Sequence, residues 1–181
     1  LEESYHSHPC HIIGPDVIRQ GTGEHQNPMD TRLRTKEEAC YTIKMNRLAL
    51  RFYPLLYPAV YYMLQKAEKS KLKNKEKQAA LSHQLQTDVI PFGACLIFTP
   101  LFAEKEEKAF DPETQFFYEE YILALRCRRK NYKIVYDPSM TVYHESGAAT
   151  KKSYSTEKKR IRFMLEKTAA ACEVYLEMLG E

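Results

Sequence analysis

The chain has 181 residues, enough to bury one sizeable core and few for two domains of comparable size. Hydrophobic residues make up 44% and charged residues 28%, which is typical of a globular protein, and a net charge of +3 identifies no partner by itself. The five cysteines lie far apart without a Cys-x-x-Cys pair, which argues against a disulfide framework and favours a reduced, cytoplasmic protein.

The first residues contain a group of histidines and a cysteine. On an extended strand His6, His8 and Cys10 would share a face and could ligate a soft metal. A structural zinc site needs a second ligand pair at a defined spacing, and none follows, so we favour a polar loop entering a buried strand. That strand is expected over residues 10–14, ending at Pro15, and residues 26–28 are predicted to form an exposed turn.

A long helical segment is predicted next. Thr35 and Glu38 have the spacing of a capping box, so a helix should begin near Lys36 and run towards Arg51. We treat residues 36–85 as a helical insertion.

The end of this segment is apolar and then basic. Residues 48–64 are rich in apolar and aromatic side chains, but Arg51, Pro54 and Pro58 interrupt the run, so it predicts neither an unbroken helix nor a membrane span. The following lysines either contact an anionic membrane, with the apolar segment lying on its surface, or are solvated while that segment packs on the domain. These lysines are Lys66, Lys69, Lys71, Lys73, Lys75 and Lys77.

Residues 89–100 form an almost continuous apolar run bounded by prolines, which predicts a buried strand interrupted at Gly93. A glycine there permits a close approach of the backbone to another group. The alternative is that Gly93 marks a bulge in the strand.

Aromatic residues and two adjacent acids follow. Asp111 and Pro112 suit the cap and first position of a helical turn that would present three aromatic side chains. Glu119 and Glu120 then begin a second helix whose end is basic, the charge order that the helix dipole favours. The aromatic residues are Phe116, Phe117 and Tyr118, and the basic ones Arg126, Arg128, Arg129 and Lys130.

The last predicted elements are strands and a helix. A period of two across Tyr132, Ile134 and Tyr136 predicts a strand, and a second short strand after a turn at Asp137 ends in His144. Residues 157–180 carry apolar side chains at alternating spacings of four and three, which predicts a C-terminal helix. Packing of this stripe on the core is favoured over packing on a partner chain.

The order of these motifs over residues 116–144 resembles the acceptor half of inverting family 2 glycosyltransferases, especially rhamnosyltransferase-like members that build bacterial surface polysaccharides. In that family an aromatic segment, a Glu-Asp or Glu-Glu pair, a helix with a basic end, a Tyr-Lys-Ile strand and a Val-x-His strand end follow one another. The resemblance implies an α/β chain, with residues 1–181 forming one domain of a partial GT-A fold, a mixed sheet with flanking helices.

The resemblance also implies roles for single residues. Glu120 would be the base that deprotonates the acceptor, and Glu119 would orient the acceptor or hold the adjacent loop. Most family members have aspartate at the second position, so glutamate moves the carboxylate outward by one methylene. The alternative is that both acids only favour the helix dipole. The resemblance places four further residues beside donor or acceptor: Gly93, Ala94, Phe117 and Tyr118.

His144 corresponds to a family histidine that completes the metal site or contacts the diphosphate, and the full-length enzyme would use Mg²⁺ or Mn²⁺. A hydrogen-bonded structural histidine is the alternative. The chain has no Asp-x-Asp motif and no Gly/Asn-rich nucleotide segment. We therefore expect it to be the C-terminal part of a longer transferase, inactive alone, with most of the donor half missing.

The resemblance implies a dTDP- or UDP-sugar as donor and a glycan or a lipid-linked glycan as acceptor. It also implies a cytoplasmic location, with or without peripheral contact to the inner face of the membrane. A competing hypothesis is a non-catalytic basic helical module that binds an anionic membrane or protein through the lysines of residues 66–77. Nucleic-acid binding is not expected, because that basic run lacks interleaved aromatic residues and a recognisable motif.

Overall fold

The computed structural model describes residues 5, 9–79, 84–114, 116–145 and 153–180, with side chains omitted from residue 67 to residue 79. These residues group into two compact units, where the sequence predicted one domain with a helical insertion. The predicted insertion and C-terminal helix make up most of the second unit. The first unit comprises Leu1–Leu33, Lys77–Asp111 and Glu120–Ser146, and the second Arg34–Glu76, Pro112–Glu119 and Gly147–Glu181.

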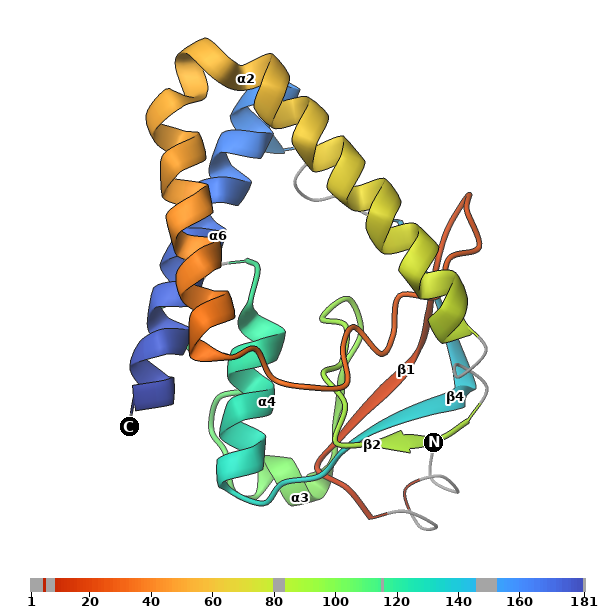
Figure 1. Cartoon of the computed structure of the whole chain (residues 1–181). Coiled ribbons are helices and arrows are strands. Elements are labelled where there is room, and N and C mark those ends of the chain that lie inside the picture. The colour runs from red at the N-terminus through yellow and green to blue at the C-terminus, as the bar shows by residue number, and fades with distance from the viewer. Residues whose placement is uncertain (1–4, 6–8, 80–83, 115, 146–152, 181) are drawn as a thin grey trace. The chain divides into compact units, whose positions relative to one another are not determined.

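The first unit contains a four-stranded mixed sheet in the order β2-β4-β1-β3. The two central strands, β1 and β4, run parallel and lie side by side (Figure 1), while β2 and β3 pair antiparallel at the edges. The prediction of an α/β chain with a mixed sheet and flanking helices is therefore confirmed. The strands are β1 (Ile12–Arg19), β2 (Gln86–Thr87), β3 (Ile97–Phe98) and β4 (Ile134–His144).

The central strands are longer than predicted. β1 does not end at Pro15 but continues to Arg19, and the two strands expected around Asp137 are one strand, β4. Pro15 lies opposite Asp137 and the next residue opposite Thr141, so residues 138–140 bulge out of the ladder. A bulge tolerates proline, which has no N–H to donate. The pairing that resumes beyond the bulge brings His144 opposite Arg19.

The apolar segment at residues 89–100 is not one strand. Ile90 forms a single bridge with Asp30, a turn follows at residues 93–94, and only β3 is regular. The chain then enters a short helix, α3 (Pro100–Ala103). The Thr99 hydroxyl donates a 2.6 Å hydrogen bond to the Cys10 carbonyl, which ties this end of the segment to the start of β1.

Helix α4 (Glu119–Arg129) begins at the predicted acid pair. Asn131 follows it with a left-handed φ of 55°, and the Tyr132 amide donates to the Cys127 carbonyl at 2.8 Å. This is the pattern of a Schellman C-cap. The helix is anchored by a buried stretch of mostly apolar residues, Tyr121, Ile122, Leu123, Ala124, Leu125 and Cys127.

The basic end of α4 is fixed to the loop before it. Glu106, whose side chain is only 8% exposed, accepts a 3.0 Å hydrogen bond from Arg126 and contacts Lys130. Arg126 also donates to the Ala109 carbonyl at 3.1 Å. The hydrogen bond from Lys130 holds the pKa of Glu106 below its ordinary value of 4.5. Desolvation by burial opposes this shift, whereas the hydrogen bond from Tyr132 and the charges of Lys130 and Arg126 also lower the pKa.

Glu106→Gln is expected to lower the free energy of unfolding by about 1 kcal/mol at neutral pH, since Lys130 is half-exposed and the ion pair is partly screened. A carboxyl whose pKa is depressed by folding stabilises the fold above its unfolded pKa, and this contribution disappears as the pH falls through the folded value. Urea unfolding from neutral pH to about pH 3 should therefore show the wild type converging on the variant. Exposed Glu107, changed to Gln, is the control, and parallel pH profiles for wild type and Glu106→Gln would contradict the prediction.

The second unit is built on two helices, α2 (Lys36–Ala79) and α6 (Glu157–Gly180). The predicted capping box is confirmed: the Thr35 amide donates to Glu38 Oε2 at 2.9 Å and the Glu38 amide to Thr35 Oγ1 at 3.3 Å. Pro54 and Pro58 were predicted to interrupt the helix, and α2 in fact continues past both. It bends sharply in this region instead (Figure 1), because each proline removes a helical hydrogen bond and crowds the preceding turn.

Packing between α2 and α6 explains why α2 survives the bend. Tyr53 is buried against Ile161 and Leu165 of α6, and its hydroxyl donates to the Lys158 carbonyl at 2.6 Å. Further along α6, the buried Tyr175 donates to the Arg34 carbonyl at 2.8 Å. The stripe predicted on the C-terminal helix thus packs on the core, as expected.

The predicted lysine run falls largely outside the described residues. The backbone of α2 is described to Ala79, but the side chains of Lys69, Lys71, Lys73, Lys75 and Lys77 are not, so their contact with a membrane stays a prediction. Lys66 is described and exposed. Within the described residues, no helix combines the length and apolar character that crossing a membrane requires.

Candidate active site

The predicted base contacts the predicted glycine. The Gly93 amide donates to Oε1 of Glu120 at 3.2 Å. A Cβ added at Gly93 would lie 2.6 Å from this oxygen and 3.2 Å from the carboxyl carbon, so glycine here permits the close approach of the backbone to the carboxylate, and it lies in a turn, not in a strand bulge. Glu120 is the second residue of α4, where a helix favours negative charge, and it is partly exposed. Ala94 follows in the same turn and is exposed.

A buried asparagine positions the Gly93 turn. Asn27, which is 2% exposed, donates to the Pro15 carbonyl at 2.6 Å and accepts from the Phe92 amide at 3.0 Å. Gly14 makes room for it, since a Cβ there would lie 2.6 Å from the Asn27 amide nitrogen. The prediction of an exposed turn at residues 26–28 is therefore wrong for its first two residues, whose amide side chains are buried.

The residues after Asn27 fix the beginning of α4. The Ile90 amide donates to the Asp30 carbonyl at 2.8 Å, and the Met29 amide to the Ile90 carbonyl at 2.9 Å. The Asp30 carboxylate accepts a 2.9 Å hydrogen bond from the hydroxyl of Tyr121, the residue after Glu120. Residues 27–30 are therefore bonded both to the segment that carries Gly93 and to the helix that carries Glu120.

His144 lies at the end of β4, as predicted. Its ring packs edge-on against Phe92, with 5.8 Å between the ring centres, and its carbonyl accepts from the Gln20 amide at 2.9 Å. Glu120 and His144 thus contact two consecutive residues, Gly93 and Phe92. This arrangement lies by the carboxyl end of parallel strand β4, where open α/β sheets commonly bind ligands.

The described residues do not complete a metal site. They contain no group of three or more His, Cys, Asp or Glu side chains that could hold an ion, so the metal role of His144 stays a prediction. His6 and His8 lie outside the described residues. Cys10 is buried, and burial raises its pKa to about 11, which opposes the thiolate that a metal would need.

The structure adds a carboxylate–imidazole pair that the sequence analysis missed. Nδ1 of His25 lies 2.9 Å from both carboxylate oxygens of the buried Asp16. Burial and the nearby Asp16 raise the pKa of Tyr136 on β4. A reversal at residues 20–24 returns His25 to β1, with left-handed φ angles at Gly21 and Gly23. Those two glycines were the signal for this reversal.

The aromatic segment before α4 differs from its prediction. Residues 116–118 form no helical turn but have left-handed φ angles of 62°, 63° and 66°. Such angles are strained for bulky side chains and often occur at functional sites. Glu119 Oε1 accepts from the Phe116 amide at 2.9 Å, and Tyr118 packs against Tyr175 with 5.4 Å between ring centres. Glu119 therefore holds the adjacent loop, one of its two predicted roles. Binding of acceptor by Phe117 and Tyr118 stays a prediction.

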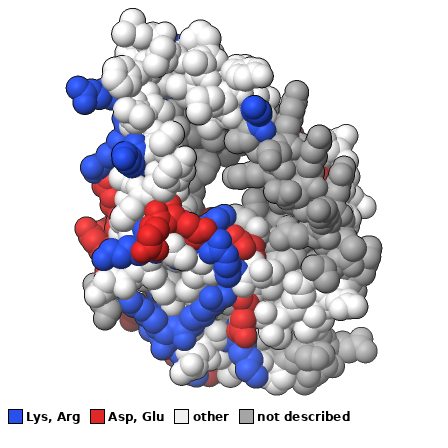
Figure 2. Space-filling view, viewed as in Figure 1, with Lys and Arg blue, Asp and Glu red and all other residues white. Residues whose placement is uncertain are grey.

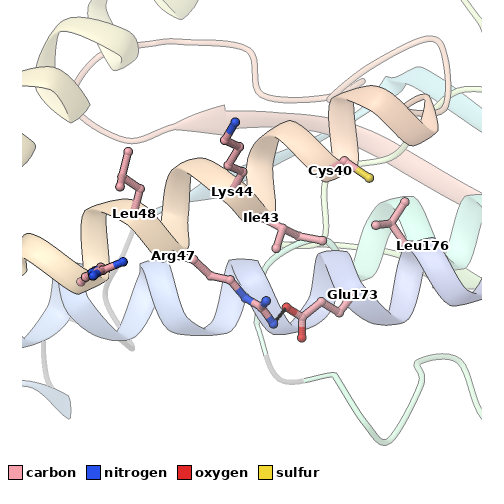
Figure 3. A pocket seen from close by; sticks show the side chains of 8 residues that line it. Cys40, Ile43, Lys44, Arg47, Leu48, Glu173 and Leu176 are labelled. Carbon is pink, nitrogen blue, oxygen red and sulfur yellow. Dashed lines mark ion pairs between the residues drawn. The ribbon is translucent and has the colours of Figure 1, made fainter.

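A surface groove of about 600 Å³ lies on the second unit, along α2 and α6. Arg47 and Glu173 form an ion pair in it, whereas Lys44 and Leu48 point away from α6 (Figure 3). The predicted site residues do not line this groove. Its lining residues are Cys40, Ile43, Lys44, Arg47, Leu48, Arg51, Glu173 and Leu176.

Comparisons of the chain with protein-family models, with curated proteins and with solved structures found no match.

Proposed function

We propose that this chain forms the acceptor side of an inverting glycosyltransferase of the GT-A type. The donor would be a nucleotide sugar such as a dTDP- or UDP-sugar, and the acceptor a glycan or a lipid-linked glycan of a surface polysaccharide. The observation that carries the proposal is the contact between the Glu120 carboxylate, at the start of α4, and the Gly93 amide. The motif resemblance assigns these same positions to the base and to substrate contact.

Glu120 acts as a general base in this proposal. The acceptor hydroxyl gives its proton to the carboxylate while its oxygen bonds to the anomeric carbon of the donor. The bond from that carbon to the diphosphate breaks, and its electron pair leaves with the nucleoside diphosphate. A base must lie within about 3 Å of the proton that it takes, so the orientation of the carboxylate matters. The Gly93 hydrogen bond supplies that orientation from one side and the helix start from the other.

The remaining site residues are assigned supporting roles. Glu119 holds the aromatic segment through the Phe116 amide, and Gly93 allows the backbone to approach the carboxylate. His144 faces Phe92, and we assign it contact with the donor diphosphate. A divalent cation would neutralise the leaving diphosphate, but the described residues do not complete a site for it, so no step above depends on one.

A single direct displacement inverts the anomeric configuration, so an α-linked nucleotide sugar should give a β-linked product. We expect proton NMR of the product, made by a full-length protein that includes the donor half, to show only the inverted anomer. A retained configuration would contradict Glu120 as a base acting in one displacement. Absence of transfer across a panel of dTDP- and UDP-sugars with lipid-linked acceptors would contradict the proposed function itself.

A further inference from the structure

Helix α2 carries two apolar faces around its bend. One face packs on α6 through Tyr53, with Tyr57, Val60 and Leu64 against the same cluster. The opposite face repeats at spacings of three and four residues and is exposed: Leu55 is 81% exposed, Tyr62 68% and Met63 60%. The large apolar side chains exposed in this part of α2 are Leu48, Phe52, Leu55, Leu56, Tyr61, Tyr62 and Met63.

The charged side chains of this part of α2 are all positive. From residue 39 to residue 67 the sequence contains no Asp or Glu, but it contains Lys44, Arg47, Arg51 and Lys66. Arg47 is paired with Glu173, whereas Arg51 and Lys66 stand on the exposed face at helical spacing from Leu48 and Leu55, with Arg51 5.7 Å from the centre of the Phe52 ring. Figure 2 shows the region around the bend as largely uncharged, with isolated Lys or Arg side chains among the described residues in view.

We propose that this face docks on an anionic lipid bilayer. We call it the bend surface and define it by Leu48, Arg51, Phe52, Leu55, Leu56, Tyr62, Met63 and Lys66. An interfacial helix inserts its apolar side chains just below the lipid head groups, while lysine and arginine reach the head-group phosphates. Tyrosine suits the same boundary because its ring is apolar and its hydroxyl is polar.

A bilayer explains features that other occupants do not. An exposed apolar face marks an interaction site, and cations without carboxylates complement the phosphates of anionic head groups. The bend surface contains no Asp or Glu. Leu48 and Arg51 at one end of it also line the groove along α2, and the other residues are separate from the cluster that packs on α6. A second copy of the chain would bring the same cations against each other. The inference rests on α2 alone and is independent of the proposed transferase activity.

Vesicle flotation of the whole chain tests the proposal. Vesicles of phosphatidylcholine with about 30% phosphatidylglycerol should bind the protein at least tenfold more tightly than pure phosphatidylcholine, and salt should weaken this binding. The combined change Leu55→Ser, Tyr62→Ser and Met63→Ser should reduce binding at least tenfold. Arg51→Gln with Lys66→Gln should reduce binding to the anionic vesicles and leave binding to the neutral ones unchanged.

Tyr143→Ser is the matched control, since Tyr143 on β4 is 67% exposed, almost as much as Tyr62. This variant should bind vesicles like the wild type. Circular dichroism of every variant should match the wild type, because the changed side chains are exposed. Absence of binding to anionic vesicles, or binding that survives the triple change, would overturn the proposal. So would a dimer in analytical ultracentrifugation that the triple change dissociates, because a second copy would then cover the surface.

Discussion

Replacing Glu120 with glutamine is expected to lower the transfer rate of the full-length protein by about 10²- to 10⁴-fold, the usual contribution of a general base. Glutamine keeps the size of the side chain and can still accept the hydrogen bond from the Gly93 amide, so the fold should be preserved. What it loses is the capacity to take the acceptor's proton. The measurement is the initial rate of sugar transfer from a radiolabelled nucleotide sugar, with urea unfolding to show that stability is unchanged.

Two further variants sharpen this experiment. Glu107→Gln makes the same chemical change at an exposed acid of the first unit and should leave the rate unchanged. Glu120→Asp retains a carboxylate but withdraws it by one methylene, so its rate should fall between those of wild type and Glu120→Gln. A Glu120→Gln protein that transfers sugar at the wild-type rate would remove Glu120 from the mechanism.

Gly93→Ala is expected to reduce transfer by about 10²-fold while leaving the protein folded, because a displacement of about 1 Å at a catalytic group can cost that much. The new Cβ would lie 2.6 Å from Oε1 of Glu120, a distance that atoms cannot keep. The carboxylate is the far end of a flexible side chain, so it turns aside at little cost in stability, less than about 1 kcal/mol. Thermal unfolding and transfer rate are measured on the same sample.

The control for this change is Gly180→Ala, where an added Cβ would meet nothing within 4 Å. It should leave the transfer rate unchanged and the unfolding temperature equal or slightly higher, because alanine favours the helix more than glycine does. Adding Gly93→Ala to Glu120→Gln should cause no further loss of transfer, because both changes act through one carboxylate. If the rate losses of the two single variants multiply in the double variant, Gly93 affects transfer by a route other than the Glu120 carboxylate.

Local signals in the sequence were sufficient for several elements. The capping box at Thr35 and the acid pair at Glu119 marked two helix starts correctly, because both depend on residues within one turn. The mixed sheet was expected only from the motif resemblance, because a period of two marks a strand but not its pairing. The pairing of Gly93 with Glu120 could be suspected only from the motif resemblance, since 27 residues separate them.

Errors arose where distant residues decide the local structure. The helix was expected to run towards Arg51 and to be interrupted by the prolines, but with Tyr53 packed on α6 it continues through a bend to Ala79. β1 was expected to end at Pro15, but β4 bulges opposite it and pairing resumes. Asn27 looked like an exposed turn residue because its two partners, the Pro15 carbonyl and the Phe92 amide, are visible only in the folded chain. Periodicity carries no information about such contacts.

Residues 27–30 have a consequence for how the carboxylate is positioned. Asn27 is bonded to the turn on one side of the Glu120–Gly93 contact, and Asp30 to the helix residue on the other. The two sides of this contact are therefore joined through residues 27–30 as well as through the Glu120–Gly93 hydrogen bond itself. The proposed proton acceptor is therefore positioned by the protein's own contacts, and changes at Asn27 should lower stability as well as turnover, because its amide is buried and hydrogen-bonded on both sides.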